Sequence, residues 1–181
     1  MSGMTIQHGL LALTLAVSVY TDIRYGKVFN VIVLPGMLFG LVSGMVVGGW
    51  PDLWASCLGL LVGGGLLFLP FLFGIMGGGD VKLAAAIGSL GGMLFVLETV
   101  AYAFVLGAGV ALAIRFFQGR LGDLFKECWH ILFGFILNLP GPIHKTNHLG
   151  PAHSGVPFAV CLAGGALGAK WLGFFNLLVA R

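Results

Sequence analysis

The chain has 181 residues, of which 59% are hydrophobic and only 8% are charged, whereas about 25% of the residues of an ordinary soluble domain are charged. This composition excludes a water-soluble globule and predicts an all-α integral membrane protein in a lipid bilayer. The formal net charge is +3, but the nine Lys and Arg residues are scattered. Because they form no basic stripe with aromatic residues, no nucleic acid is expected as a partner.

Uncharged apolar stretches predict the membrane-spanning helices. Stretches of about 20 such residues cross a bilayer as a helix, and four uncharged stretches are that long or longer: residues 1–21, 28–51, 53–79 and 146–169. Hydropathy predicts a single transmembrane domain, residues 1–181, with about six transmembrane helices at residues 4–21, 28–48, 53–74, 80–94, 95–117 and 154–176.

The first helix is expected to be retained rather than cleaved as a signal peptide. No basic residue precedes Leu10, and no short A-x-A-like site follows it. With the N-terminus outside, seven basic residues fall on the cytoplasmic side: Arg24, Lys27, Lys82, Arg115, Arg120, Lys126 and Lys145. Only Lys170 and Arg181 fall on the other side, so this orientation satisfies the positive-inside rule.

Residues 118–153 are expected to form a cytoplasmic or interfacial loop region within the domain. They include an apolar run, residues 124–139, that is interrupted by Lys126, Glu127 and His130. Such a run is typical of a segment that lies in the interface, although a re-entrant segment has the same pattern.

Glycine is abundant, with 31 residues, and part of it is periodic. In membranes, small residues allow helix backbones to approach closely. Gly36, Gly40, Gly44 and Gly48 recur at every fourth position. This repeat predicts that one face of the second helix packs tightly.

Asp22 and Asp80 are the acids whose positions need an explanation. An Asp buried in a span costs about 2.5–3.5 kcal/mol on insertion scales. Asp22 ends the first predicted helix and Asp80 begins the fourth, so two intervening crossings bring both acids to one membrane face. Singly, Asp22 could be a solvated helix-end acid and Asp80 a helix N-cap. The glycines at 77–79 favour a functional site, because they permit backbone conformations closed to other residues and leave room for an extended substrate strand.

Two motifs resemble those of a known family. Residues 77–83, GGGDVKL, resemble the G-x-G-D motif of intramembrane aspartyl peptidases, in the version of the type IV prepilin and preflagellin peptidases. Residues 20–30, YTDIRYGKVFN, are similar to that family's other signature, an Asp followed by a basic turn and an Ile-Pro-Asn-like triplet. Phe29 replaces the usual Pro, whereas Asn30 is retained. Residues 156–158 resemble the start of the family's last span.

The resemblance implies a membrane aspartyl endopeptidase of the bacterial inner membrane. It would remove the leader from a prepilin precursor at the cytoplasmic face, with Asp22 and Asp80 as the catalytic pair and no cofactor. Residues that would bind substrate or shape the site are Gly77, Gly78, Gly79, Lys82, Arg24 and Asn30. The chain lacks the cysteine-containing insert of the long family members, so it resembles the short form associated with tight-adherence (Flp-type) pili, and N-methylation is not expected.

No metal site is predicted. Cys57, Cys128 and Cys161 are widely separated and are expected to be buried free thiols. His144 and His148 have the spacing of helical metal ligands, but the surrounding Gly and Pro residues are not typical of a helix.

Two other functions fit parts of the pattern. A small proton- or cation-coupled transporter or channel subunit would use Asp22 or Asp80 as an ion site and the glycines as a broken helix. A structural membrane subunit of pilus assembly would use the acids only for assembly, and both acids would then tolerate replacement by Asn. The sequence predicts no oligomeric state.

Overall fold

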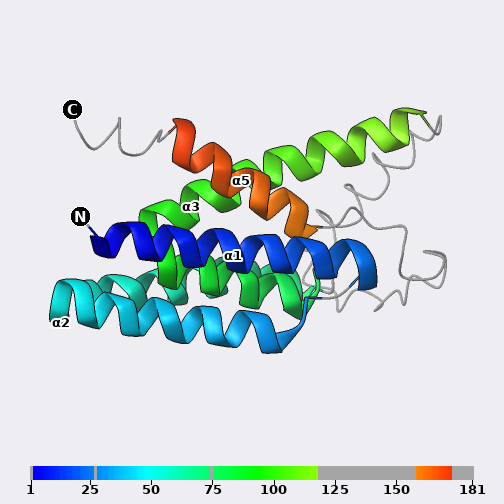
Figure 1. Cartoon of the computed structure of the whole chain (residues 1–181). Coiled ribbons are helices and arrows are strands. Elements are labelled where there is room, and N and C mark those ends of the chain that lie inside the picture. Colours follow the sequence, from blue (N-terminus) through cyan, green and yellow to red (C-terminus); the bar gives the residue numbers. More distant parts are fainter. Residues whose placement is uncertain (1, 27, 74–75, 118–157, 173–181) are drawn as a thin grey trace. The chain divides into compact units, whose positions relative to one another are not determined.

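The computed structural model describes residues 2–26, 28–73, 76–117 and 158–172. Every element in these residues is a helix: α1 (Ser2–Tyr25), α2 (Asn30–Leu72), α3 (Gly78–Phe117) and α5 (Phe158–Leu172) (Figure 1). The prediction of an all-helical chain is confirmed for this part of the sequence. The described residues divide between two units, one that contains α1, α2, α3 up to Leu106 and α5, and another that contains residues 107–117.

Two glycines break the long helices. Gly49 in α2 has φ +69° and Gly92 in α3 has φ +83°, in the left-handed region that favours glycine. Pro51 follows the break in α2 and suits the start of a new helical segment. The α2 chain folds back on itself, because a Cβ added to Gly44 would lie 2.7 Å from Ser56 Oγ. The Gly49 break lies between the predicted helices 28–48 and 53–74, and the Gly92 break lies close to the predicted junction of residues 94 and 95.

The described helices have the length and surface of a membrane protein. Residues 30–72 and 78–114 form helices long and apolar enough to cross a bilayer, and Phe158–Trp171 is a shorter apolar helix. Large apolar side chains cover the outer surface, including Leu13, Val31, Leu38, Val46, Leu61 and Val105. A soluble monomer rarely exposes so much contiguous apolar surface. The number of crossings stays a prediction.

The first segment of α3, residues 78–91, forms the centre of the larger unit. Its residues 83–90 are all buried, as expected for a helix surrounded by other helices. Both segments of α2 approach its backbone closely. A Cβ added to Gly59 would collide with the carbonyl of Gly88, and one added to Gly40 would lie 2.8 Å from the carbonyl of Ser89.

The predicted tight packing of the glycine face is confirmed. Gly36, Gly40 and Gly44 are buried, and a Cβ at any of them or at Gly48 would contact atoms of another helical segment. The glycines therefore allow backbone approach that larger side chains would prevent.

In the second unit, residues 107–117 are described and continue α3 as a helix. The predicted loop region 118–153, with its apolar run 124–139, lies outside the described residues.

Candidate active site

Asp22 lies in the last turn of α1. The helix ends at Tyr25. The next residue, Gly26, has φ +61°, and its N–H donates to the Asp22 carbonyl at 2.8 Å, as in a glycine C-cap. The Asp22 side chain is half-buried and points to another helix. Its Oδ2 accepts a hydrogen bond from the backbone N–H of Ala159, at the start of α5, at 3.1 Å.

Asp80 lies in the first turn of α3. Its N–H donates to the Gly77 carbonyl at 3.1 Å, and its carboxylate accepts a hydrogen bond from the backbone of Gly77. The carboxylate bond corresponds to that of the acid in a helix capping box, whereas the N–H bond to the carbonyl three residues earlier is of the 3₁₀ type. Asp80 is therefore not the N-cap of α3, as considered from the sequence, but its third residue, with its carboxylate bonded to the backbone of Gly77 just before the helix.

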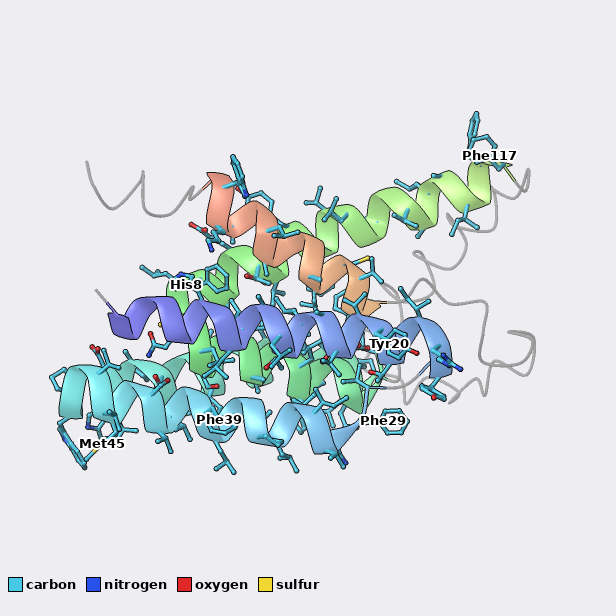
Figure 2. All side chains as sticks on the ribbon, in the orientation of Figure 1. His8, Tyr20, Phe29, Phe39, Met45 and Phe117 are labelled. Atoms are coloured by element: carbon cyan, nitrogen blue, oxygen red, sulfur yellow. The ribbon has the colours of Figure 1, made fainter. Side chains whose placement is uncertain are left out.

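The fold brings the two acids together. The charge of Asp22 acts on the Asp80 carboxyl, and the side chain of Cys161 on α5 is close enough to interact with both acids. In Figure 1 the end of α1 and the start of α5 lie at one end of the larger unit. Figure 2 places Tyr20 and Phe29 at this end and His8 and Met45 toward the opposite end. Two interacting carboxyls ionise together less readily than either does alone, so the pair is expected to titrate as a coupled unit.

The three glycines before Asp80 differ in their surroundings. A Cβ on Gly79 would lie 3.0 Å from Val28 Cβ, and one on Gly78 would lie 3.3 Å from a ring atom of Phe71. At Gly77 the nearest atom would be Asp80 Oδ2 at 3.5 Å. The expected conformational reason for these glycines is wrong, because none of the three has a positive φ. A Cβ at Gly79 would press against Val28, and Gly77 is the most open of the three.

Lys82 connects the two family-like motifs. Its Nζ donates to Asn30 Oδ1 at 2.9 Å, and both side chains are exposed. Because Asn30 is the first residue of α2 and Lys82 lies in α3, the bond joins the beginnings of two helices. The two residues singled out from the sequence thus contact each other, and Lys82 lies two residues after Asp80.

Arg24 lies on the exposed surface of α1. Its Nη1 donates to Tyr20 Oη at 2.7 Å, and its guanidinium carbon is 5.9 Å from the ring centroids of Tyr20 and Tyr25. The structure therefore places the Arg24 guanidinium next to the rings of Tyr20 and Tyr25.

Phe29, which stands where the resembling family has Pro, is the N-cap of α2. It has φ −80° and ψ 132°, and this φ is within the range that Pro adopts. The backbone at this position keeps the conformation that a Pro would impose.

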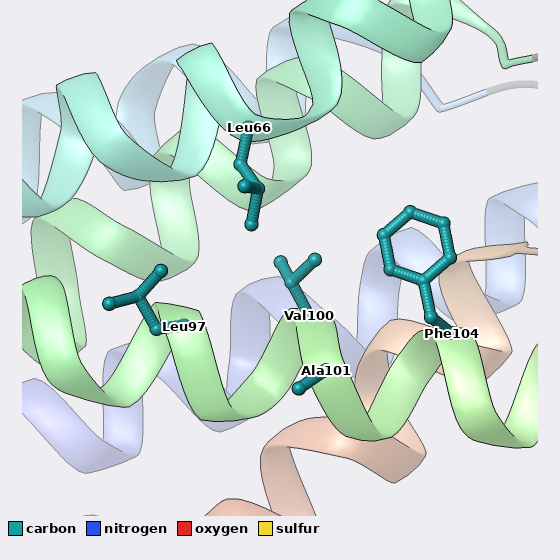
Figure 3. Close-up of a pocket in the computed structure, with 5 residues that line it drawn as sticks. All are labelled: Leu66, Leu97, Val100, Ala101 and Phe104. Carbon is teal, nitrogen blue, oxygen red and sulfur yellow. The ribbon is translucent and has the colours of Figure 1, made fainter.

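An apolar pocket of about 370 Å³ lies between the second segments of α2 and α3 (Figure 3). Its lining consists of Leu66, Leu97, Val100, Ala101 and Phe104. These side chains offer no acid, base or nucleophile, so the pocket does not compete with the pair of acids as a reaction centre.

Two contributors to the site were missed in the sequence. Ala159 acts through its backbone N–H, which every residue except Pro possesses, so no residue type marks it. Cys161 was predicted to be a buried free thiol, and it is one, but its proximity to both acids was not foreseen. The sequence did offer one signal for this proximity, because the last helix was predicted to start on the same side of the membrane as the two acids.

No group of three or more His, Cys, Asp or Glu side chains in the described residues could hold a metal ion. His144, His148 and Cys128 lie outside the described residues.

Comparison with known proteins identifies one family. The model of the type IV leader peptidase family matches residues 9–112. The matched range includes both acids and the glycines that precede Asp80, and it ends before α5. No curated protein and no solved structure matches the chain.

Proposed function

Because the chain belongs to the type IV leader peptidase family, we propose that it is an aspartyl endopeptidase in which Asp22 and Asp80 form the catalytic pair. The single observation that carries this assignment is the approach of the two carboxyls from α1 and α3. A pair of acids that shares one proton contains both a general base and a general acid.

The reaction follows from this shared proton. The ionised carboxylate takes a proton from water while the water oxygen attacks the scissile carbonyl carbon. The protonated partner donates its proton to the carbonyl oxygen, which gives a tetrahedral intermediate. When this intermediate collapses, the C–N bond breaks and the leaving amine takes a proton from the pair. Peptide hydrolysis then needs no group beyond the two acids and water.

The proposed substrate is a type IV prepilin precursor with a short basic leader and a hydrophobic helix. A peptide within a helix has its carbonyls in backbone hydrogen bonds, so the cleavage site must be extended or locally unwound. Gly77 is the best candidate for contact with such a strand, because a Cβ there would have no neighbour closer than 3.5 Å. Gly78, Gly79, Lys82, Asn30 and Arg24 shape the surroundings.

The chain is proposed to process Flp-type precursors without N-methylation. Only residues 26–29 connect α1 to α2. This connection is too short for the cysteine-containing insert that accompanies methylation in the long family members.

The proposed location is the bacterial inner membrane, with several crossings, an external N-terminus and the acids at the cytoplasmic face. The distribution of Lys and Arg supports this orientation. A precursor whose basic leader remains in the cytoplasm would present its cleavage site on that side.

Replacement of either acid tests the function. Asp22→Asn and Asp80→Asn are expected to lower precursor cleavage at least about a hundredfold, because each removes a group required for proton transfer. The chain is co-expressed with a tagged Flp-type pilin precursor, and leader removal is followed by gel shift. Asp52→Asn, in the turn region after the Gly49 break, is the matched control and should process normally. Cleavage that persists in a well-inserted Asp22→Asn or Asp80→Asn variant refutes the aspartyl mechanism.

A further inference from the structure

The last helix contributes to the acid pair although the family match ends at residue 112. Ala159 is the second residue of α5, and its N–H donates to Asp22 Oδ2 at 3.1 Å. The first four N–H groups of a helix have no acceptor within that helix. The partial positive charge at a helix N-terminus also favours a carboxylate. Asp22 therefore receives a directed bond and a favourable field from an element 137 residues away.

Cys161, in the same turn of α5 as Ala159, agrees with this placement of the helix. Its side chain lies close enough to interact with both Asp22 and Asp80, and the residue is 5% exposed. Ala159 is fully buried. The first turn of α5 thus forms an inner wall of the site.

Close packing against the second segment of α3 holds α5 in place. A Cβ added to Gly165 would lie 2.9 Å from the backbone nitrogen of Ala103, and the rings of Phe104 and Phe158 are 5.9 Å apart. These contacts set the position of α5 along its axis, and a shift of α5 would move the Ala159 N–H away from Asp22.

We propose that α5 is a positioning element of the active site, in which the Ala159 N–H orients the Asp22 carboxylate beside Asp80. This inference rests on the proposed function. It makes Ala159 a positioning residue, whose effect on the reaction is exerted through Asp22.

A backbone ester at position 159 tests the bond. Incorporation of the α-hydroxy analogue of alanine replaces the N–H by oxygen and keeps the side chain. The α-hydroxy analogue of valine at position 160 is the matched control, because it changes the next N–H of the same helical turn. Both esters weaken the preceding carbonyl as an acceptor to a similar degree. Full-length protein in liposomes is assayed with a purified Flp-type precursor over a range of pH.

The ester at 159 is expected to lower kcat/KM roughly ten- to a hundredfold, as for loss of a hydrogen bond to a charged group. The acid limb of its pH profile should move to higher pH, because loss of a donor disfavours the ionised carboxylate. The ester at 160 should resemble the wild type. Equal losses in the two esters, or an unshifted acid limb at 159, would overturn the inference.

A stability cycle tests the same bond without activity. The 159 ester should lower the unfolding midpoint of the wild type and have a much smaller effect in Asp22→Ala, which lacks the acceptor. Equal effects in both backgrounds would also overturn the inference. Failure of the proposed function has a different signature, because Asp22→Asn would then cleave precursor normally whatever the esters do.

Discussion

Asp80 combines a local structural role with a proposed chemical one. Its carboxylate bonds the backbone of Gly77, and it is also within range of the Asp22 charge. The sequence offered capping and catalysis as competing explanations, whereas the structure is compatible with both. A carboxylate has two oxygens and about four acceptor sites, so a capping bond leaves capacity for water and substrate.

Lys82 and Asn30 likewise have a structural contact in addition to their proposed place in the site. They are 52 residues apart in sequence and joined by one hydrogen bond. The bond links the element that carries Asp80 to the turn that follows Asp22. We interpret this hydrogen bond as a contact that maintains the spacing of the two acid-bearing motifs.

A double-mutant cycle measures the coupling between the Lys82 and Asn30 side chains. Lys82→Ala and Asn30→Ala are each expected to slow precursor cleavage a few-fold, because an exposed hydrogen bond contributes little. The double variant should be no slower than the worse single one, with a coupling of roughly two- to fivefold. Lys170→Ala, a basic residue in the last turn of α5, is the control. Independent, multiplicative effects would show that the two side chains act separately.

At the scale of elements, glycine has two distinct uses in this chain. Gly49 and Gly92 adopt positive φ and break long helices. Gly59 and Gly88, by contrast, lie within helical segments and allow two backbones to touch. The first use reverses the direction of the chain, and the second brings the segment that begins with Asp80 into the centre of its unit.

Gly59→Ala should destabilise the protein by about 2–3 kcal/mol, because the added Cβ meets the rigid carbonyl of Gly88. Gly65→Ala on the same helix is the matched control, since a Cβ there has no neighbour within 4 Å. Alanine is also the better helix former, so this control should unfold at the same point as the wild type or slightly later. The measurement is denaturant unfolding in detergent micelles. Similar losses at both positions would contradict the close packing of Gly59 and Gly88.

At the scale of the whole molecule, orientation in the bilayer is the main property to establish. We predict that a green fluorescent protein fused after residue 26 is fluorescent, because that end of α1 is cytoplasmic. Alkaline phosphatase fused after residue 51 should be active, because the α2 turn faces outside. Each reporter placed at the other position is the control and should be silent. The reverse pattern would invert the topology and place the acids outside the cell.

The sequence by itself predicted a helical chain suited to a membrane and singled out Asp22 and Asp80 as a pair. Hydropathy and charge predicted a helical membrane chain, and the parity of crossings predicted that Asp22 and Asp80 lie at one membrane face. In the structure the charge of Asp22 acts on the Asp80 carboxyl. Their catalytic role remains a prediction. Such inferences are possible from sequence because a bilayer constrains the length and direction of each helix almost independently of its neighbours.

Only the tertiary structure decided which groups surround the acids. The bonds from Ala159 to Asp22 and from Lys82 to Asn30 depend on the rotation and axial position of each helix. The rotation and axial position of a helix result from many close contacts, such as Gly59 with Gly88 and Gly165 with Ala103. A periodic pattern in the sequence does not predict the combined effect of these contacts. A backbone N–H is also common to nearly every residue, so its selection at Ala159 has no signature in the sequence.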